Sequence, residues 1–227
     1  MSVSTTAARS TLFLRNATGL VKAALEILGE TQSLEFSLRE LARRAGVSHN
    51  APYKHFANRR ELLAAVSAAG FEMLTKRMAR EIAGFGSPRE QLFAMLRAYI
   101  AHGVENPALY SLMFGGYLSG PDHGRPAIEL AEGDKTKALL ADVIIAGGLG
   151  RAIPRTPRNE PKIAGAILAC WSLVHGLTLL LADGLVGPKK KSDALADTLV
   201  QGLLDGLAGE LPMLPPGTWV GPQAPHR

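Results

Sequence analysis

Five side chains that could bind nucleic acid lie within one short stretch of the chain. They are His49, Asn50, Tyr53, Lys54 and His55. Asparagine and histidine can hydrogen-bond to base edges in a DNA groove, whereas lysine, tyrosine and histidine commonly bind phosphate oxygens. His55 is equally suited to packing, so residue type alone leaves its role open.

Two short helices joined by a tight turn would present these side chains. Ser37 is a good N-cap for the first helix, and Glu40 completes the sequence pattern of a capping box. Gly46 can adopt the left-handed conformation that a sharp turn requires. Ser48 would cap the second helix, which we expect to end near His55. Pro52 should make the start of that helix irregular, because it removes a donor and restricts the preceding residue. The pattern predicts a helix-turn-helix.

The positive charge of the chain is concentrated around this stretch. The formal net charge is +5, and residues 1–60 contain nine Lys or Arg but four acids, whereas bases and acids balance in the remainder. Such asymmetry favours a polyanionic partner for the first quarter of the chain. On charge alone, a basic face that is merely solvated is the alternative.

The stretch Phe36–Leu63 resembles the DNA-binding domain of tetracycline-repressor-like (TetR) regulators. The resemblance rests on Ala42, Gly46-Val47-Ser48, Tyr53, His55-Phe56, Arg59 and Leu62-Leu63, and it is strong from Leu14 to Leu63. It implies that Ser48–His55 is a recognition helix for the major groove of double-stranded operator DNA. It also implies phosphate contacts from Ser37, Tyr53, His55 and Arg59, the last standing where the family usually has lysine. Asn50 and His49 are then the candidates for base contacts. The predicted DNA-binding set is Ser37, Ser48, His49, Asn50, Tyr53, Lys54, His55 and Arg59.

Apolar residues at helical spacing, separated by Gly and Pro clusters, predict an all-α fold along the rest of the chain. After a polar, frayed stretch over residues 1–10, the expected helices are Leu12–Leu28, the two short ones above, Arg59–Phe85, Arg89–Val104, Pro107–Gly115, Arg125–Ala146, Pro157–Ala182 and Ser192–Glu210. We therefore expect a DNA-binding domain over 1–60. A long helix would join it to a ligand-binding and dimerisation domain over 61–210, and a Pro-rich tail without regular structure would cover 211–227.

The C-terminal half carries a weaker resemblance. Trp171, followed by His175-Gly176, and the stretch Asn106–Gly115 are similar to the ligand domain of a TetR subgroup with a Trp-His-Gly signature. The resemblance implies a small-molecule effector of unknown identity that releases the protein from DNA, usually as a repressor. Apolar side chains with a few polar tips are typical of such pockets, although plain core packing is the alternative for each one. The predicted ligand-binding set is Phe71, Met95, Tyr99, His102, Tyr110, Phe114, Tyr117, Trp171 and His175.

The last helix has an apolar stripe that suits a homodimer. Leu195, Leu199 and Leu203 are spaced four apart, with Val200 and Leu207 nearby. The resemblance implies that the last two long helices form a four-helix bundle with a second copy, so that the dimer reads a near-palindromic operator. The alternative is that this stripe packs against the core of the same chain.

The sequence gives no support for an enzyme. No two histidines have HExxH spacing, and Cys170 alone cannot supply a thiolate zinc site. No GxSxG motif is present. Gly147-Gly148-Leu149-Gly150 follows no predicted strand, which argues against a phosphate-binding loop. We therefore expect no catalytic residue, no metal and no cofactor, and we interpret Cys170 as a core residue in a reducing compartment.

The hydropathy pattern favours a soluble, cytoplasmic protein without a membrane partner. The longest apolar stretch, Ile163–Leu181, is interrupted by Gly165 and His175, so it lacks the roughly 18 uninterrupted apolar residues of a membrane span. The N-terminus shows no signal-peptide pattern. A ligand-binding helical dimer that does not bind an operator is the alternative function, and an enzyme is the least favoured.

Overall fold

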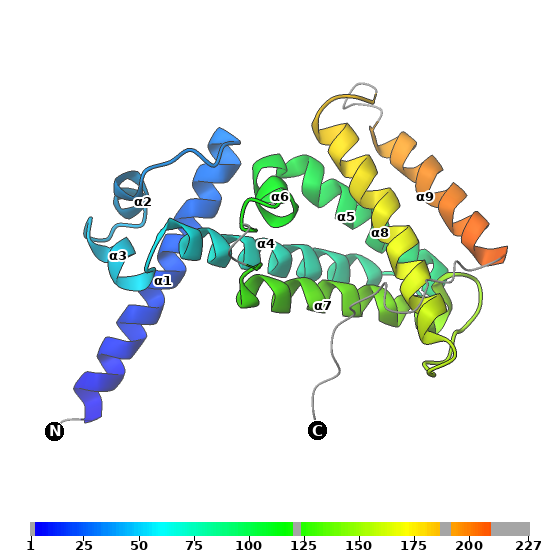
Figure 1. The fold of residues 1–227 in the computed structure, drawn as a ribbon, viewed down its shortest axis with the longest axis horizontal. Helices are drawn as coiled ribbons and strands as arrows, with labels where there is room; N and C mark the ends of the chain where they lie inside the picture. Colours follow the sequence, from blue (N-terminus) through cyan, green and yellow to red (C-terminus); the bar gives the residue numbers. More distant parts are fainter. Residues whose placement is uncertain (1–2, 120–123, 187–191, 210–227) are drawn as a thin grey trace. The chain divides into compact units, whose positions relative to one another are not determined.

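A computed structural model describes residues 3–119, 124–186 and 192–209, and all regular structure within these ranges is helical (Figure 1). The helices are α1 (Val3–Thr31), α2 (Leu38–Arg44), α3 (Ala51–His55), α4 (Arg59–Ile82), α5 (Pro88–Glu105), α6 (Pro107–Phe114), α7 (Ala127–Val143), the π-helical turn η1 (Ile144–Gly148), α8 (Glu160–Ala182) and α9 (Ser192–Gly209). The all-α prediction is confirmed.

The chain divides into two compact units. The first unit comprises residues up to Phe71 together with Asn106–Ala131, and the second comprises Glu72–Glu105 and the residues from Glu132 onward. Helix α4 begins in the first unit and continues into the second, and α7 does the same. Each unit has its own buried apolar residues, so each is described separately.

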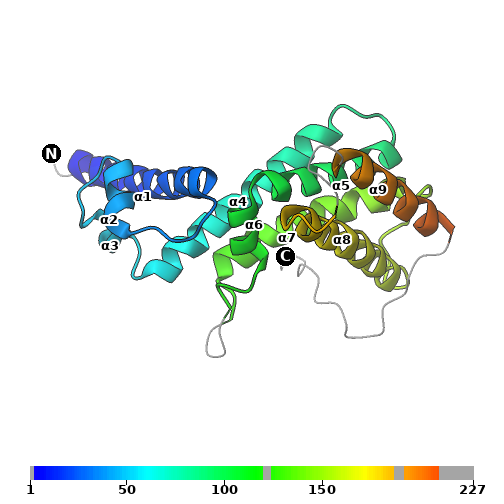
Figure 2. The same cartoon turned by 90° about the horizontal axis from the view of Figure 1, so that it is seen from above.

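In the first unit, α1 packs against α2, α3 and α6 (Figure 2). Leu20 and Ala24 of α1 and Leu41 of α2 are completely buried. Ala42 is also buried, and its small side chain suits a close contact between the short helices. The helix-turn-helix pair is therefore fixed to a core that α1 supplies.

In the second unit, α5 is the central helix and contacts α8, α9 and η1. Leu92 and Met95 of α5, Cys170 of α8 and Val200 of α9 are fully buried. The α8 segment is long and apolar enough to cross a membrane by length and composition alone, but half of that segment is buried within the structure. Its apolar character is therefore explained in part by its place in this core.

The glycine cluster after α7 ends a helix at a close helix contact. Gly147 has a φ of +116°, a conformation that an L side chain rarely adopts. A Cβ atom on Gly148 would lie 2.9 Å from the Val143 carbonyl oxygen and 3.0 Å from Cδ2 of Leu92. These glycines thus allow η1 to approach α5, which gives the cluster a packing role.

Several predicted helix boundaries are wrong. Helix α1 begins at Val3 rather than Leu12 and ends at Thr31 rather than Leu28, so residues 3–10 of the stretch expected to fray are helical. The helix that follows Pro157 starts at Glu160, and the one predicted to reach Ala146 changes to η1 after Val143. The predicted Pro-rich tail over 211–227 lies outside the described residues.

Candidate nucleic-acid interface

Helix α2 begins with the predicted cap but without the full capping box. The Ser37 hydroxyl oxygen accepts a hydrogen bond from the Glu40 backbone N–H at 3.1 Å. The Glu40 carboxylate does not return to the Ser37 backbone. It instead accepts from the side chains of Arg43, at 2.8 and 2.9 Å, and Arg44, at 3.3 Å.

An ion-pair cluster anchors α2 to α1. Arg44 donates to Glu30 of α1 at 2.6 Å and also contacts Glu40. Hydrogen bonds from Arg43 and then Arg44 lower the pKa of Glu40 to about 2, against burial that would raise it. The hydrogen bond from Arg44 likewise lowers the pKa of Glu30. Both carboxylates are therefore ionised at neutral pH, and they hold two of the α2 arginines at the protein surface.

Helix α3 exposes the side chains that the sequence singled out. Ala51 and Pro52 are buried, whereas His49, Asn50 and Lys54 are exposed. Tyr53 is 65% exposed, which is unusual for a large aromatic side chain. The predicted start at Ser48 is wrong, because α3 begins at Ala51 with Asn50 at the N-cap position. Pro52 in the first turn explains this short helix, and Ser48 is an exposed turn residue whose carbonyl accepts from the Ala51 backbone N–H at 2.8 Å.

His55 lies at the edge of this surface. Its side chain is half-buried, and burial followed by the nearby charge of Lys54 lowers its pKa. The imidazole is therefore mainly neutral at pH 7. A neutral imidazole can still donate one hydrogen bond to a phosphate oxygen.

A surface depression of about 390 Å³ lies beside α2 and the turn that follows it. Its lining consists of Ser37, Arg39, Glu40, Ala42, Arg43, Val47 and His49. Arg39 is exposed and forms no ion pair among the residues that the structure describes. Sequence reasoning missed Arg39, although its place two residues after the Ser37 cap could have indicated it. The depression brings Ser37 and His49 together with an unpaired cation.

The Arg59 side chain, for which the resemblance implied a phosphate contact, hydrogen-bonds to the protein backbone. Its guanidinium donates to the Phe36 carbonyl at 2.6 Å and to the Leu34 carbonyl at 2.5 Å. It also lies over the Phe36 ring, 4.6 Å from the centroid. Arg59 therefore fixes the loop that leads into the Ser37 cap. Its neighbour Asn58 caps α4, because the Asn58 side-chain oxygen accepts from the Glu61 backbone N–H at 2.9 Å.

The residues predicted to bind a ligand fall into both units. In the first unit, Phe114 contacts Phe71 edge to face, at 5.1 Å between centroids, and also contacts Tyr110 at 4.7 Å. Phe71 and Tyr110 are buried, whereas Tyr117 is 54% exposed.

In the second unit, Tyr99 of α5 meets two residues of α8. The Trp171 indole N–H donates to the Tyr99 hydroxyl oxygen at 3.1 Å, and that hydroxyl lies 3.3 Å from His175 Nδ1. Met95 and His102 are buried in the same unit. Burial, with a smaller effect of Arg77, lowers the pKa of His102 to about 4. Among the described residues, no group of three or more His, Cys, Asp or Glu side chains could hold a metal ion.

The apolar residues of α9 divide into two faces. Ala196, Val200, Leu204 and Leu207 are buried in the second unit. The predicted dimer residues lie on the other face, where Leu199 is 38% exposed and Leu195 and Leu203 are half-buried. On α8, Leu179 and Leu180 are about as exposed as Leu199, at 40% and 42%.

Comparisons with known proteins agree with this arrangement. Residues 20–66 match the family model for bacterial regulatory proteins of the tetR family, and residues 92–203 match the model for a tetracyclin repressor-like C-terminal domain. The HTH-type transcriptional regulator Rv1816 of Mycobacterium tuberculosis is 31% identical over 119 residues, covering 48% of this chain and 51% of the relative. The chain thus spans about half the length of the curated relatives that it matches.

Solved structures share the fold over most of their length. A protein of unknown function from Rhodococcus sp. RHA1 has a TM-score of 0.66 and 27% identity, with 84% of this chain and 96% of that chain covered. A tetR-family transcriptional regulator from Streptomyces coelicolor has a TM-score of 0.62 and 22% identity, with 85% and 81% covered. With both family models matched in chain order on an all-α fold, the chain belongs to the tetR family of bacterial regulatory proteins.

Proposed function

We propose that this protein is a sequence-specific DNA-binding transcription regulator that acts as a homodimer in the cytoplasm. The observation that carries the proposal is the exposed surface of α2 and α3. There His49, Asn50, Tyr53 and Lys54 are solvent-exposed beside a depression that contains the unpaired Arg39. Exposed amide, imidazole, phenol and cationic groups together suit DNA better than they suit a protein core.

The contacts would divide into two kinds. Asn50 and His49 precede α3 and would meet base edges in the major groove. Ser37, Arg39, Tyr53, Lys54 and His55 would bind phosphates and set the register. Ser48, exposed in the turn before α3, is a further candidate for a phosphate.

A dimer would place two such surfaces on one operator. The outward leucines of α8 and α9 support this proposal, because exposed apolar side chains on adjacent helices favour burial against a second copy. A two-fold dimer reads two half-sites, so the operator would be a near-palindrome.

We further propose that a small-molecule effector in the C-terminal domain releases the protein from its operator, as a repressor. Of the residues predicted to bind it, Tyr99, Trp171 and His175 form one hydrogen-bonded group on α5 and α8. That group combines apolar area with polar tips, and it would suit an uncharged or weakly polar molecule.

Selection of duplexes from a random DNA library tests the proposal. The purified protein should enrich a motif with two-fold symmetry, and binding of that duplex should require two chains. Tyr53→Ala should weaken binding about tenfold, as expected for one lost contact to a charged group. Leu185→Ala is the control, since Leu185 is a similarly exposed large side chain that belongs to the second unit. No enrichment would favour the alternative, a ligand-binding dimer without DNA binding.

A further inference from the structure

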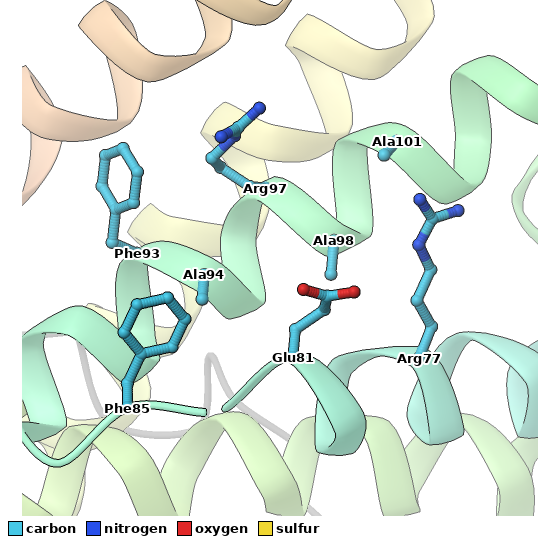
Figure 3. Close-up of a pocket in the computed structure, with 8 residues that line it drawn as sticks. All are labelled: Arg77, Glu81, Phe85, Phe93, Ala94, Arg97, Ala98 and Ala101. Atoms are coloured by element: carbon cyan, nitrogen blue, oxygen red, sulfur yellow. The ribbon is translucent and has the colours of Figure 1, made fainter. Parts of the chain in front are cut away.

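A groove in the second unit lies apart from the residues discussed so far. It has a volume of about 360 Å³ and is lined by the second half of α4, the residues after it, and α5 (Figure 3). Ala94, Ala98 and Ala101 of α5 form one side, and their small side chains leave room for an occupant. None of the predicted ligand-binding residues lines this groove.

The aromatic residues lie toward one end of the groove. Phe85 is 42% exposed and follows α4, and Phe93 is half-buried on α5. Figure 3 shows Phe85 and Glu81 pointing toward the alanines of α5. Exposed phenyl rings present faces of negative potential, which attract cations.

The two arginines that line the groove are already paired. Arg77 donates to both carboxylate oxygens of Glu105, at 2.5 and 2.9 Å. Arg97 contacts Asp197 at 2.7 Å. An anion entering the groove would have to compete with these carboxylates, so the arginines do not make it an anion site.

Glu81 is the acid of the groove lining, and its charge acts through space on Arg77, which is already paired with Glu105. Glu81 is exposed, lines the groove, and forms no ion pair among residues 3–119, 124–186 and 192–209. Arg77 and Arg97 are matched by Glu105 and Asp197, so these two cations and the three acids, Glu81 included, carry a net charge of −1.

We propose that this groove binds an organic cation with an apolar body, whose charge lies near Glu81 and whose apolar part rests against Phe85, Phe93 and the alanines. A carboxylate beside aromatic faces is the chemistry that recognises such cations. This proposal does not require that the protein bind DNA. Its test measures only the binding of a small ion to the protein.

Two ions of nearly the same shape and opposite charge test the proposal. Tetraphenylphosphonium and tetraphenylborate are titrated separately into the full-length protein by isothermal calorimetry. The cation should bind with one site per chain and at least tenfold more tightly than the anion. Equal affinities, or tighter binding of the anion, would overturn the proposal.

Two variants test whether the cation binds in this groove. Glu81→Gln should weaken binding of the cation about two- to fivefold, and Phe85→Leu should do the same through the lost ring face. Glu72→Gln is the matched control, because Glu72 is an exposed acid on α4 that pairs with Lys76 outside the groove. Both Glu81 and Phe85 are exposed, so far-UV circular dichroism should be unchanged. A Glu81→Gln variant that binds the cation as tightly as the wild type would refute the assignment.

Discussion

Replacing Arg59 separates two possible roles of this residue. The family resemblance implies that its guanidinium contacts a DNA phosphate. In the structure the same group donates to the carbonyls of Leu34 and Phe36 and lies over the Phe36 ring. We therefore predict that Arg59 acts by positioning the loop before α2, and that it contributes mainly to stability.

The size of the effect follows from these contacts. Each hydrogen bond from a half-buried charged group contributes about 1 kcal/mol after solvent screening, and the cation–ring contact adds about 0.5–1 kcal/mol. Arg59→Ala should therefore lower the free energy of unfolding by about 2–3 kcal/mol. Arg59→Lys keeps the charge but cannot reach both carbonyls with a planar fork, so it should lose about half of that amount.

Two measurements distinguish the roles. Urea denaturation gives the free energy of unfolding, and DNA affinity at several salt concentrations gives the slope of log K against log salt. For Arg59→Ala we expect lower stability and an unchanged slope. Arg39→Ala is the control, because an exposed, unpaired cation that binds a phosphate should change the slope by about 1 without affecting stability. A slope lowered by about 1 in Arg59→Ala, with normal stability, would refute the reasoning.

Three further predictions concern the base contact, the dimer and pH. Asn50→Ala should cost about 1–3 kcal/mol on the selected operator but much less on random DNA, and equal losses in a binding titration would remove Asn50 from base recognition. Leu199→Glu or Leu203→Glu should produce monomers in sedimentation equilibrium; a wild-type protein that is already monomeric at micromolar concentration would contradict this. Because the pKa of His102 is lowered to about 4 in the folded protein, the neutral form favours folding. Its contribution to stability should be full above about pH 6.5 and be lost as the pH falls toward 4. His102→Gln should flatten that part of the denaturation profile, and an unchanged profile would contradict the prediction.

The parts of the fold that depend on local residue chemistry could be predicted. The Ser37 cap needs a side-chain oxygen three residues before a free backbone N–H, and the structure shows this hydrogen bond. Gly46, with a φ of +65°, makes the predicted turn. Such interactions span a few residues, so the sequence pattern specifies them directly.

The features that could not be predicted from the sequence depend on tertiary contacts. Glu40 would have completed a capping box, but arginines one turn later compete for its carboxylate. The role of Arg59 depends on carbonyls more than twenty residues earlier in the chain. The glycine cluster at 147–150 is explained by the approach of η1 to Leu92, which no local pattern reveals. The position of Arg39 near the Ser37 cap could have indicated it, but the sequence does not show that Arg43 and Arg44 pair with Glu40 while Arg39 does not.

The central claim is specific DNA recognition by the α2–α3 surface, and one affinity ratio tests it most directly. Fluorescence anisotropy at about 150 mM salt would compare the duplex enriched by selection with a shuffled duplex of the same composition. We predict that the enriched duplex binds at least about 10³-fold more tightly, with two chains per duplex. Equal affinity for the two duplexes would contradict the claim and leave only nonspecific binding by the basic N-terminal quarter.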